Sequence, residues 1–468
     1  MNRNKQLLTY IGADLVAAIC AWTLFCVCRA QLINHQMVDS AVFLPFNYAW
    51  VLATFAFLIV CFTVNYLTGY YLKPFRKVLL VELMTTIIAS VIISLFVFFI
   101  LLIGKSIAFD RILDSFLILL GLYFGITYLF RFIITRRTIN RLRRGDCGFN
   151  TLIIGTGYNA LKTYEELGNH KKREGNIVVG FISVDNSPRV VDKSMILSSI
   201  NKIKEIVVAH NIAEFFVAID NADEKKIFDI TSQLYQFNKP VKLWPRVYEI
   251  LTGRVRMTNL YFSPFVNITE LQVPDWEICC KRVFDVGLAA ILMVLLSPVY
   301  LYLAIRVKMD SPGPVFYKQM RVGLHGVPFT IIKFRTMYCN SENGTPLLTS
   351  PNDKRITPYG RLMRKYRLDE LPQFFNILKG DMAIVGPRPE RKFFIDQIIQ
   401  QASYYCLVYK VRPGLTSWGP IKVGYTDTME KMVERLNYDI VYLENMSLVT
   451  DLQILMLTLA ILIRGKGH

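Results

Sequence analysis

Four long apolar runs constrain the fold of this chain more than any other feature of its sequence. They cover roughly residues 7–27, 48–67, 78–103 and 112–134. About 20 apolar residues in a helix are enough to cross the hydrocarbon core of a bilayer. Hydrophobic residues also make up 53% of the 468 residues, a high fraction for a soluble protein. The sequence predicts a membrane protein with four transmembrane helices in residues 1–145, and we expect no cleaved signal peptide.

Basic residues at the ends of these runs indicate their orientation. They are Arg3 and Lys5 before the first run, Lys73, Arg76 and Lys77 between the second and third, and Arg136, Arg137, Arg141, Arg143 and Arg144 after the fourth. The positive-inside rule places the N-terminus and everything after residue 136 in the cytoplasm. Asp14 lies inside the first run, and a buried acid there can indicate transport. Because Asp14 is near the basic end, we favour an interfacial or helix-packing role.

The segment from 146 to 250 predicts a Rossmann-like α/β domain. "NTLIIGTGYNALKTYEEL" has the pattern of a strand, a glycine-rich turn and a helix, and Gly155, Gly157 and Ala160 fit GxGxxA. Strand-like "IVVGFISV" and "AEFFVAI" follow. Asp185 comes somewhat late for a ribose-binding acid. Nucleotide binding and a structural or regulatory role both stay open, and the second is favoured because a fold does not decide a function.

Several function classes are not supported by the composition. The nine cysteines form no CxxC pair and the five histidines show no HxxxH or HExxH spacing, so a zinc site is not expected. The net charge of +18 would suit nucleic acid, but no nucleic-acid-binding motif appears. We therefore expect no nucleic acid partner.

A further apolar run lies in residues 281–308, beyond a linker at 251–275. Its core, from Val286 to Ile305, is long enough to span a bilayer. Basic residues flank both ends, which favours the cytoplasmic side for each. Ser297 and Pro298 interrupt the run, and proline breaks or kinks a helix. We predict a re-entrant hairpin, with a fifth crossing kinked at proline as the alternative.

Two adjacent acids, Asp369 and Glu370, stand in "RLDELPQFFNIL". Pro372 fits the first turn of a helix, where carboxylates often cap backbone amides. Alternatively, one carboxylate attacks an activated phosphorus while its neighbour binds a divalent metal. The residues alone leave both interpretations open.

Basic residues from separate segments are candidates for binding a phosphate-containing substrate. In the strand-like "IIKFRTM", period-two alternation puts Lys333 and Arg335 on one face. Arg388 stands between two prolines, which limit its backbone, and a guanidinium suits phosphate geometry. The full set of candidates is Arg321, Lys333, Arg335, Arg364, Arg388 and Arg412.

Six motifs follow one another within residues 276–468. They are "KRVFD…LLSPVYL", "GPVFYKQMRVG", "IIKFRTM", "LDELPQFFNILKGDMAIVGPRP", "VRPGLTSWG" and "YDIVYLENMSLVTDLQIL". This ordered set resembles the bacterial sugar transferase family. Members of this family are also called monotopic phosphoglycosyl transferases. The four apolar runs and the Rossmann-like segment resemble the longer members, such as undecaprenyl-phosphate glucose or galactose phosphotransferases. One departure from the family pattern is "SWGPIKVGY", at residues 417–425. Many members carry a QVxGR-like run there that ends in arginine, whereas the run in this chain ends in Tyr425.

The resemblance implies a reaction and residue roles. A sugar 1-phosphate, from a UDP-sugar of a hexose such as glucose or galactose, moves to undecaprenyl phosphate and UMP is released. Asp369 would be the nucleophile that forms a covalent aspartyl-phosphosugar intermediate. Glu370 would bind Mg²⁺ (or Mn²⁺), with Asp451 as a further acidic position for metal. Ser297 and Pro298 match the family's re-entrant break.

The expected protein therefore has α and α/β parts: the four-helix region, the Rossmann-like domain, and a membrane-surface catalytic domain at 276–468. We expect it in the bacterial inner membrane, catalysing on the cytoplasmic face the first step of exopolysaccharide, capsule or O-antigen assembly. Its partners would be the two substrates and the lipid bilayer, and the motifs also allow a homodimer. The alternatives are a membrane glycosyltransferase that releases UDP and a non-catalytic, nucleotide-sensing membrane scaffold.

Overall fold

The computed structural model describes most of the chain. The described ranges are 3–33, 48–103, 109–145, 147–168, 175–184, 190–220, 223–237, 239–244, 265–269, 271, 273–339, 353–424 and 428–463. Asp185 and Tyr425, which were singled out from the sequence, lie outside these ranges, as does most of the predicted linker.

The first part consists of long helices that follow the four apolar runs. They are α1 (Arg3–Ile33), α2 (Tyr48–Leu67), α3 (Leu79–Ile103) and α4 (Phe109–Arg144). All four are long and apolar enough to cross a membrane. Trp22, Phe57 and Tyr123 pack in their common core, whereas large apolar side chains such as Leu52 and Leu80 face outward. Apolar outward faces are expected of helices surrounded by lipid.

A buried ion pair joins α1 to α4. Arg131 Nε and Nη2 donate to the two carboxylate oxygens of Asp14 at 2.8 and 2.7 Å. The hydroxyl of Tyr71 donates to the same carboxylate at 2.8 Å, and Arg131 also donates to Thr86 at 3.0 Å. Both charged side chains are buried. This bidentate contact supports the helix-packing role expected for Asp14.

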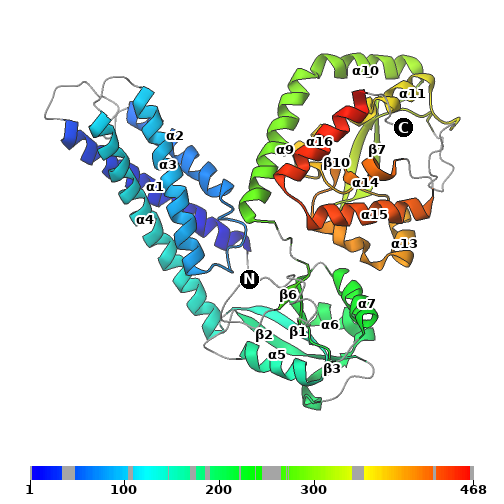
Figure 1. Ribbon diagram of the computed structural model, residues 1–468, viewed down its shortest axis with the longest axis horizontal. Coiled ribbons are helices and arrows are strands. Elements are labelled where there is room, and N and C mark those ends of the chain that lie inside the picture. Colours follow the sequence, from blue (N-terminus) through cyan, green and yellow to red (C-terminus); the bar gives the residue numbers. More distant parts are fainter. Residues whose placement is uncertain are drawn as a thin grey trace. The chain divides into compact units, whose positions relative to one another are not determined.

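The second part is a Rossmann-like α/β domain (Figure 1). Its strands are β1 (Phe149–Ile154), β2 (Asn176–Ser183), β3 (Ile196–Ser199), β4 (Glu214–Val217), β5 (Val241–Leu243) and β6 (Val266–Asn267). Their order is β3-β2-β1-β4-β5-β6. The pairs β2–β3, β1–β4 and β4–β5 are parallel, and β6 is antiparallel to β5. The helices are α5 (Tyr158–Gly168), α6 (Ile203–Ala209) and α7 (Glu224–Tyr235), with 3₁₀ turns η2 (Lys193–Met195) and η3 (Ile200–Lys202). The parallel-sheet α/β domain predicted from the sequence is confirmed.

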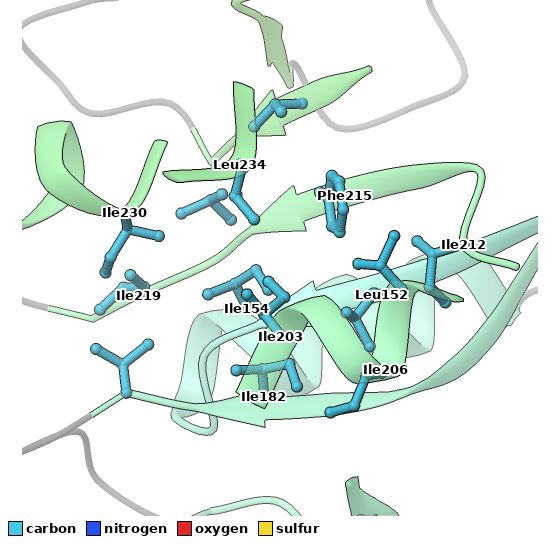
Figure 2. Close-up of a cluster of buried hydrophobic side chains, with 14 of the residues drawn as sticks. Leu152, Ile154, Ile182, Ile203, Ile206, Ile212, Phe215, Ile219, Ile230 and Leu234 are labelled. Atoms are coloured by element: carbon cyan, nitrogen blue, oxygen red, sulfur yellow. The ribbon is translucent and has the colours of Figure 1, made fainter. Parts of the chain in front are cut away.

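The core of this domain lies between its sheet and the helices that cover it. Leu152 of β1 and Phe215 of β4 are register partners, and Ile206 of α6 and Leu234 of α7 pack with them (Figure 2). Both strands are almost continuously buried, as expected of a parallel sheet covered on both faces.

The glycine-rich turn between β1 and α5 lies close to the residues that follow β4. Gly155 has a φ of +127°, and a Cβ there would collide with the carbonyl oxygen of Ala218. The amide of Asn159, in the first turn of α5, donates to Asp220 Oδ1 at 3.0 Å. A carboxylate of the domain thus takes an amide that a bound pyrophosphate would otherwise use. The nucleotide-binding and the structural or regulatory alternatives for the domain both stay open.

The third part begins with a bent helix pair. Between helices α9 (Asp275–Leu295) and α10 (Ser297–Asp310) the chain bends by 65° from a straight path (Figure 1). The break falls at Leu296, one residue before the predicted Ser297-Pro298, and the proline stands in the first turn of α10, where its missing donor is not needed. Counted as one span, the pair would be a fifth candidate crossing.

The remaining elements form a compact domain around two short sheets. They are β7 (Phe316–Val322), η4 (Leu324–Gly326), β8 (Pro328–Phe334), α11 (Pro358–Lys365), η5 (Leu368–Glu370), α12 (Gln373–Lys379), β9 (Ala383–Val385), α13 (Lys392–Gln401), η6 (Ser403–Lys410), β10 (Gly414–Thr416), α14 (Trp418–Val423), α15 (Met429–Glu444) and α16 (Leu448–Ile463). Strands β7 and β8 form an antiparallel hairpin, and β9 and β10 pair in parallel. Leu303 and Val307 of α10 pack on Phe334 of β8 and Met363 of α11.

Candidate active site

Asp369 and Glu370 lie in the same 3₁₀ turn, η5, and both are buried. Arg367, just before the turn, has a φ of +53°, which few residues other than glycine adopt. The N-cap of the following helix α12 is Pro372, which has no side-chain acceptor. Asp369 and Glu370 lie in the preceding turn, so neither of them stands at the N-cap of α12.

Helix α12 is fastened to β8, and this brings Lys333 to the acidic turn. The side chain of Asn376 accepts from the amide of Ile332 at 3.1 Å and donates to the carbonyl of Thr330 at 2.7 Å. Lys333 is the next residue of β8, and its Nζ lies 2.7 Å from Glu370 Oε1. The strand thus supplies the shortest cation contact of Glu370.

The bent helix pair also reaches the acidic turn. The hydroxyl of Tyr300, on α10, donates to the carbonyl oxygen of Leu371 at 2.6 Å. Leu371 follows Glu370 directly in the chain. Helix α10 also packs on β8, which carries Lys333. The same helix therefore contacts both the strand and the acidic turn of the site.

Arg388 approaches from the loop after β9. The amide of Gly386 donates to Thr416 O at 3.0 Å, which extends the pairing of β9 with β10. A Cβ at Gly386 would lie 2.5 Å from the carbonyl oxygen of Arg412, so glycine permits this close approach. The loop then places Arg388 Nη1 3.9 Å from Glu370 Oε1.

Glu370 is surrounded by cations. Besides Lys333 and Arg388, Arg367 Nη1 lies 3.9 Å from its other oxygen, Oε2. Burial by itself would raise the pKa of Glu370, but the three cations outweigh it and hold that pKa well below its usual range. Glu370 is therefore ionised at neutral pH.

Asp369 is shifted in the opposite direction. Burial and the negative charge of Glu370 raise the pKa of Asp369, while Lys333 and Arg364 oppose the increase. Adjacent carboxyl groups with opposite pKa shifts are typical of sites where the two have different chemical tasks.

A small cavity opens beside the acidic pair. Lys333, Glu370, Gln373, Arg388 and Gly414 are among its lining residues. Lys333 and Arg388 both lie near Glu370 Oε1, so an anionic group that enters the cavity would contact both cations. A phosphate is the anion that such an arrangement suits.

The structure brings together four of the six basic residues predicted to bind substrate. Lys333 and Arg388 contact Glu370. Arg321 lines the same cavity as these two residues and lies 3.4 Å from Glu390. Arg364 donates to Thr336 Oγ1 at 2.9 Å and acts electrostatically on Asp369.

The other two basic residues bind backbone carbonyls instead. Arg335 donates to the carbonyls of Ser311 and Pro312 at 2.6 and 2.8 Å, and Arg412 donates to Gly380 O at 2.9 Å. Arg335 lies one residue beyond the end of β8 at Phe334, and its amide donates to Val315 O at 2.9 Å, so the shared face with Lys333 stays a prediction.

Asp451, expected as a metal ligand, is engaged elsewhere. Its carboxylate accepts from Lys281 Nζ at 2.5 Å and from the hydroxyl of Tyr442 at 2.7 Å, so it ties α16 to α9 and α15. Within the described ranges, no group of three or more His, Cys, Asp or Glu side chains could hold a metal ion.

The sequence analysis did not identify a cluster of buried charged residues next to Arg388, formed by Glu390, Arg435 and Asp439. Glu390 lies 2.5 Å from Arg435 Nη2, and Asp439 accepts hydrogen bonds from Ser417, Gly419 and Arg388. Arg435 and Asp439 stand four residues apart on α15, so they share one buried helix face. Charged residues at that spacing on an amphipathic helix were the available signal.

Residues 276–465 match a family model described as bacterial sugar transferase. An uncharacterized sugar transferase of Bacillus subtilis, EpsL, is 39% identical over 187 residues, which span 40% of this chain and 89% of that protein. The chain belongs to the bacterial sugar transferase family. The family membership predicted from the motifs is confirmed.

Two longer relatives have an activity in their names. The UDP-N-acetylgalactosamine-undecaprenyl-phosphate N-acetylgalactosaminephosphotransferase of Aeromonas hydrophila is 38% identical over 49% of this chain and 53% of that protein. The UDP-glucose:undecaprenyl-phosphate glucose-1-phosphate transferase of Escherichia coli is 34% identical over 56% of each chain. The chain spans about half the length of the first curated relatives it matches. Residues 66–245 match a second model, described as a CoA-binding domain.

Proposed function

We propose that this sugar transferase moves a hexose 1-phosphate from a UDP-sugar to undecaprenyl phosphate and releases UMP. The observation that carries the proposal is the buried Asp369–Glu370 turn with Lys333 and Arg388 at its carboxylate and a small cavity beside it. The names of relatives that act on UDP-sugars and undecaprenyl phosphate support it. The reaction would start the assembly of a lipid-linked polysaccharide.

The proposed chemistry has two steps at one phosphorus atom. A carboxylate oxygen of Asp369 attacks the phosphorus that carries the sugar, and the bond from that phosphorus to the UMP oxygen breaks. UMP leaves and the sugar phosphate stays on Asp369 as an acyl phosphate. An oxygen of undecaprenyl phosphate then attacks the same phosphorus, and the bond to Asp369 breaks. The products are the lipid diphosphate sugar and free Asp369.

The cations of the site would assist both steps. Lys333 and Arg388 lie where they can hold phosphate oxygens while Glu370 keeps them oriented. Donors fixed in a buried site stabilise developing charge more strongly than the same groups in water. Arg364, near Asp369, would favour the ionised nucleophile.

A magnesium ion fits part of the donor set expected from the family. Mg²⁺ in phosphate-transfer sites is bound through one or two carboxylates, water and substrate phosphates. Glu370 supplies such a carboxylate in the lining of the cavity, and Asp369 precedes it in the same turn. The carboxylate of Asp451 is instead held by Lys281 and Tyr442. When bound, the metal would neutralise charge on the diphosphate.

The membrane arrangement is part of the proposal. Basic residues at both ends of the α9–α10 pair, together with the 65° bend, support a re-entrant hairpin over a fifth crossing. Exposed apolar side chains at the bend, including Val294, Leu295 and Leu301, suit insertion into lipid. Catalysis would then take place on the cytoplasmic face of the inner membrane.

A donor screen tests the proposed function. The purified full chain is incubated with undecaprenyl phosphate, Mg²⁺ and one of several UDP-sugars, and the released nucleotide is identified. We expect UMP. Release of UDP would establish a glycosyltransferase instead, and the absence of turnover with every donor would favour a non-catalytic scaffold.

A further inference from the structure

Arg388 is held by more than the strand that precedes it. Strands β9 and β10 are parallel, so their carboxyl ends lie at the same edge of this small sheet. Arg388 follows β9 by three residues and Ser417 follows β10 directly. Asp439, on α15, contacts both of these segments.

The contacts of Asp439 divide between its two oxygens. Oδ1 accepts hydrogen bonds from the hydroxyl of Ser417 and from the amide of Gly419, the latter at 3.3 Å. Oδ2 accepts from the backbone amide of Arg388 at 3.4 Å. The side chain is 4% exposed, so water does not substitute readily for these partners. One buried carboxylate therefore fixes the backbone at the base of the Arg388 side chain.

We propose that Asp439 is a positioning residue, which holds the backbone of Arg388 so that its guanidinium faces Glu370. This inference rests on the proposed function. Glu390 also approaches the guanidinium, 3.9 Å from Arg388 Nε, and is itself held by Arg435. Arg388 thus has its amide bound by Asp439 and its guanidinium attracted by both Glu370 and Glu390.

The chain offers a matched control for this role. Asp285 is also buried, and it accepts the backbone amide of Ile384, in β9, at 3.1 Å. Asp285 thus supports the same strand through the same kind of hydrogen bond, four residues before Arg388. A general loss of packing should appear in Asp285→Asn as well as in Asp439→Asn. An effect that acts through Arg388 should appear only in the second.

A double-mutant cycle with Arg388→Ala tests the proposal. UMP release by the full chain is followed with a radiolabelled donor so that low rates remain measurable. Asp439→Asn should lower kcat/KM about tenfold or more in the wild-type background, because small displacements of a positioned group have large kinetic effects. In the Arg388→Ala background the same change should cost less than about twofold, since the group being positioned is gone. Asp285→Asn should have equal effects in both backgrounds.

Two results would overturn the inference in distinguishable ways. Equal losses from Asp439→Asn in both backgrounds would show a purely structural role while leaving the proposed function intact. A wild-type protein that releases no UMP would overturn the proposed function and this inference with it. If Asp439→Asn does not fold, Ser417→Ala replaces it in the cycle, because it removes one donor from Asp439 and leaves Arg388 unchanged. Its smaller loss should likewise vanish in the Arg388→Ala background, and persistence of that loss would refute the role.

Discussion

Lys333 Nζ lies 2.7 Å from Glu370 Oε1, and this contact joins a β-strand to the turn that carries the proposed nucleophile. The lysine lowers the pKa of Glu370 and opposes the increase in the pKa of its neighbour Asp369. One cation thus acts on both acids. The two carboxyl groups are consequently expected to respond differently to substitution.

Asp369→Asn should abolish most activity without unfolding the protein. Asparagine is close in size to aspartate, but its amide is not an equivalent nucleophile. We expect UMP release to fall by orders of magnitude while the thermal unfolding temperature changes little. Intact-mass or peptide mass spectrometry, with UDP-sugar and no lipid acceptor, should find a phosphosugar on the Asp369 peptide of the wild type only. A fully active Asp369→Asn variant would exclude Asp369 as the nucleophile.

Glu370→Gln should also be severe, but for a different reason. The change removes the charge that orients Lys333 and Arg388 and weakens the proposed metal contact. Part of the defect should therefore recover as Mg²⁺ is increased. Activity is measured across a magnesium titration with Asp369→Asn as the control, whose defect should not respond. A defect in Glu370→Gln that is independent of magnesium would argue against a metal-binding role.

Asp14→Asn should destabilise the four-helix part of the chain. It leaves Arg131 buried without its carboxylate, and removal of one partner of a buried ion pair typically costs about 3–5 kcal/mol. Asp114→Asn, an exposed position on α4, is the matched control and should have little effect. Thermal unfolding in detergent measures both variants. Replacing both partners with apolar residues should restore part of the loss, and an unchanged stability in Asp14→Asn would show that the pair does not hold the helices together.

Asp439 should give the protein a distinctive dependence of stability on pH. Burial, opposed in part by Ser417 and Arg435, raises the pKa of Asp439 to about 6. A raised pKa means that the folded state binds the proton more tightly, so this stabilisation is present below the ordinary value near 4 and is lost as the pH rises through about 6. The full change is roughly 3 kcal/mol. Asparagine does not titrate, so the stability of Asp439→Asn relative to wild type should increase by up to that amount between pH 4 and pH 8.

The pH prediction is checked by unfolding both proteins in detergent at several pH values. Asp396→Asn, an exposed position on α13, controls for the loss of one negative charge. The curve of this control should stay close to that of the wild type across the range. Parallel curves for Asp439→Asn and wild type would show that Asp439 does not titrate in this interval.

The two ends of the α9–α10 pair should react from the same side of the membrane. Trp276 and Met309 lie at these ends and are 50% and 71% exposed, so cysteine at either position should be reactive. Lys281 is unsuitable because it binds Asp451. In a background without native cysteines, Trp276→Cys and Met309→Cys should both be labelled from the cytoplasmic side. Asp39→Cys, which the charge pattern places on the opposite side, is the control, and labelling of Met309→Cys from that opposite side would establish a fifth crossing.

Local patterns in the sequence were sufficient for the parts of the fold that depend on neighbouring residues. The four apolar runs predicted four long helices, because a helix that spans a bilayer needs about 20 consecutive apolar residues and such a run is visible in the sequence. The strand, turn and helix around Gly155 followed from a short motif whose backbone needs glycine. Pro298 predicted a break in the apolar run at residues 281–308, because proline disrupts the helical turn that precedes it. The break lies within one residue of the predicted position.

Only the tertiary structure decided which side chains meet. Arg131 pairs with Asp14 at a sequence separation of 117 residues, and Lys281 pairs with Asp451 at a separation of 170. The alternation of residues along β8 did not reveal the partners of its basic side chains: Lys333 binds Glu370, whereas Arg335 binds the carbonyls of Ser311 and Pro312. Ion pairs over such separations depend on how whole elements dock, and no periodicity along the chain encodes that.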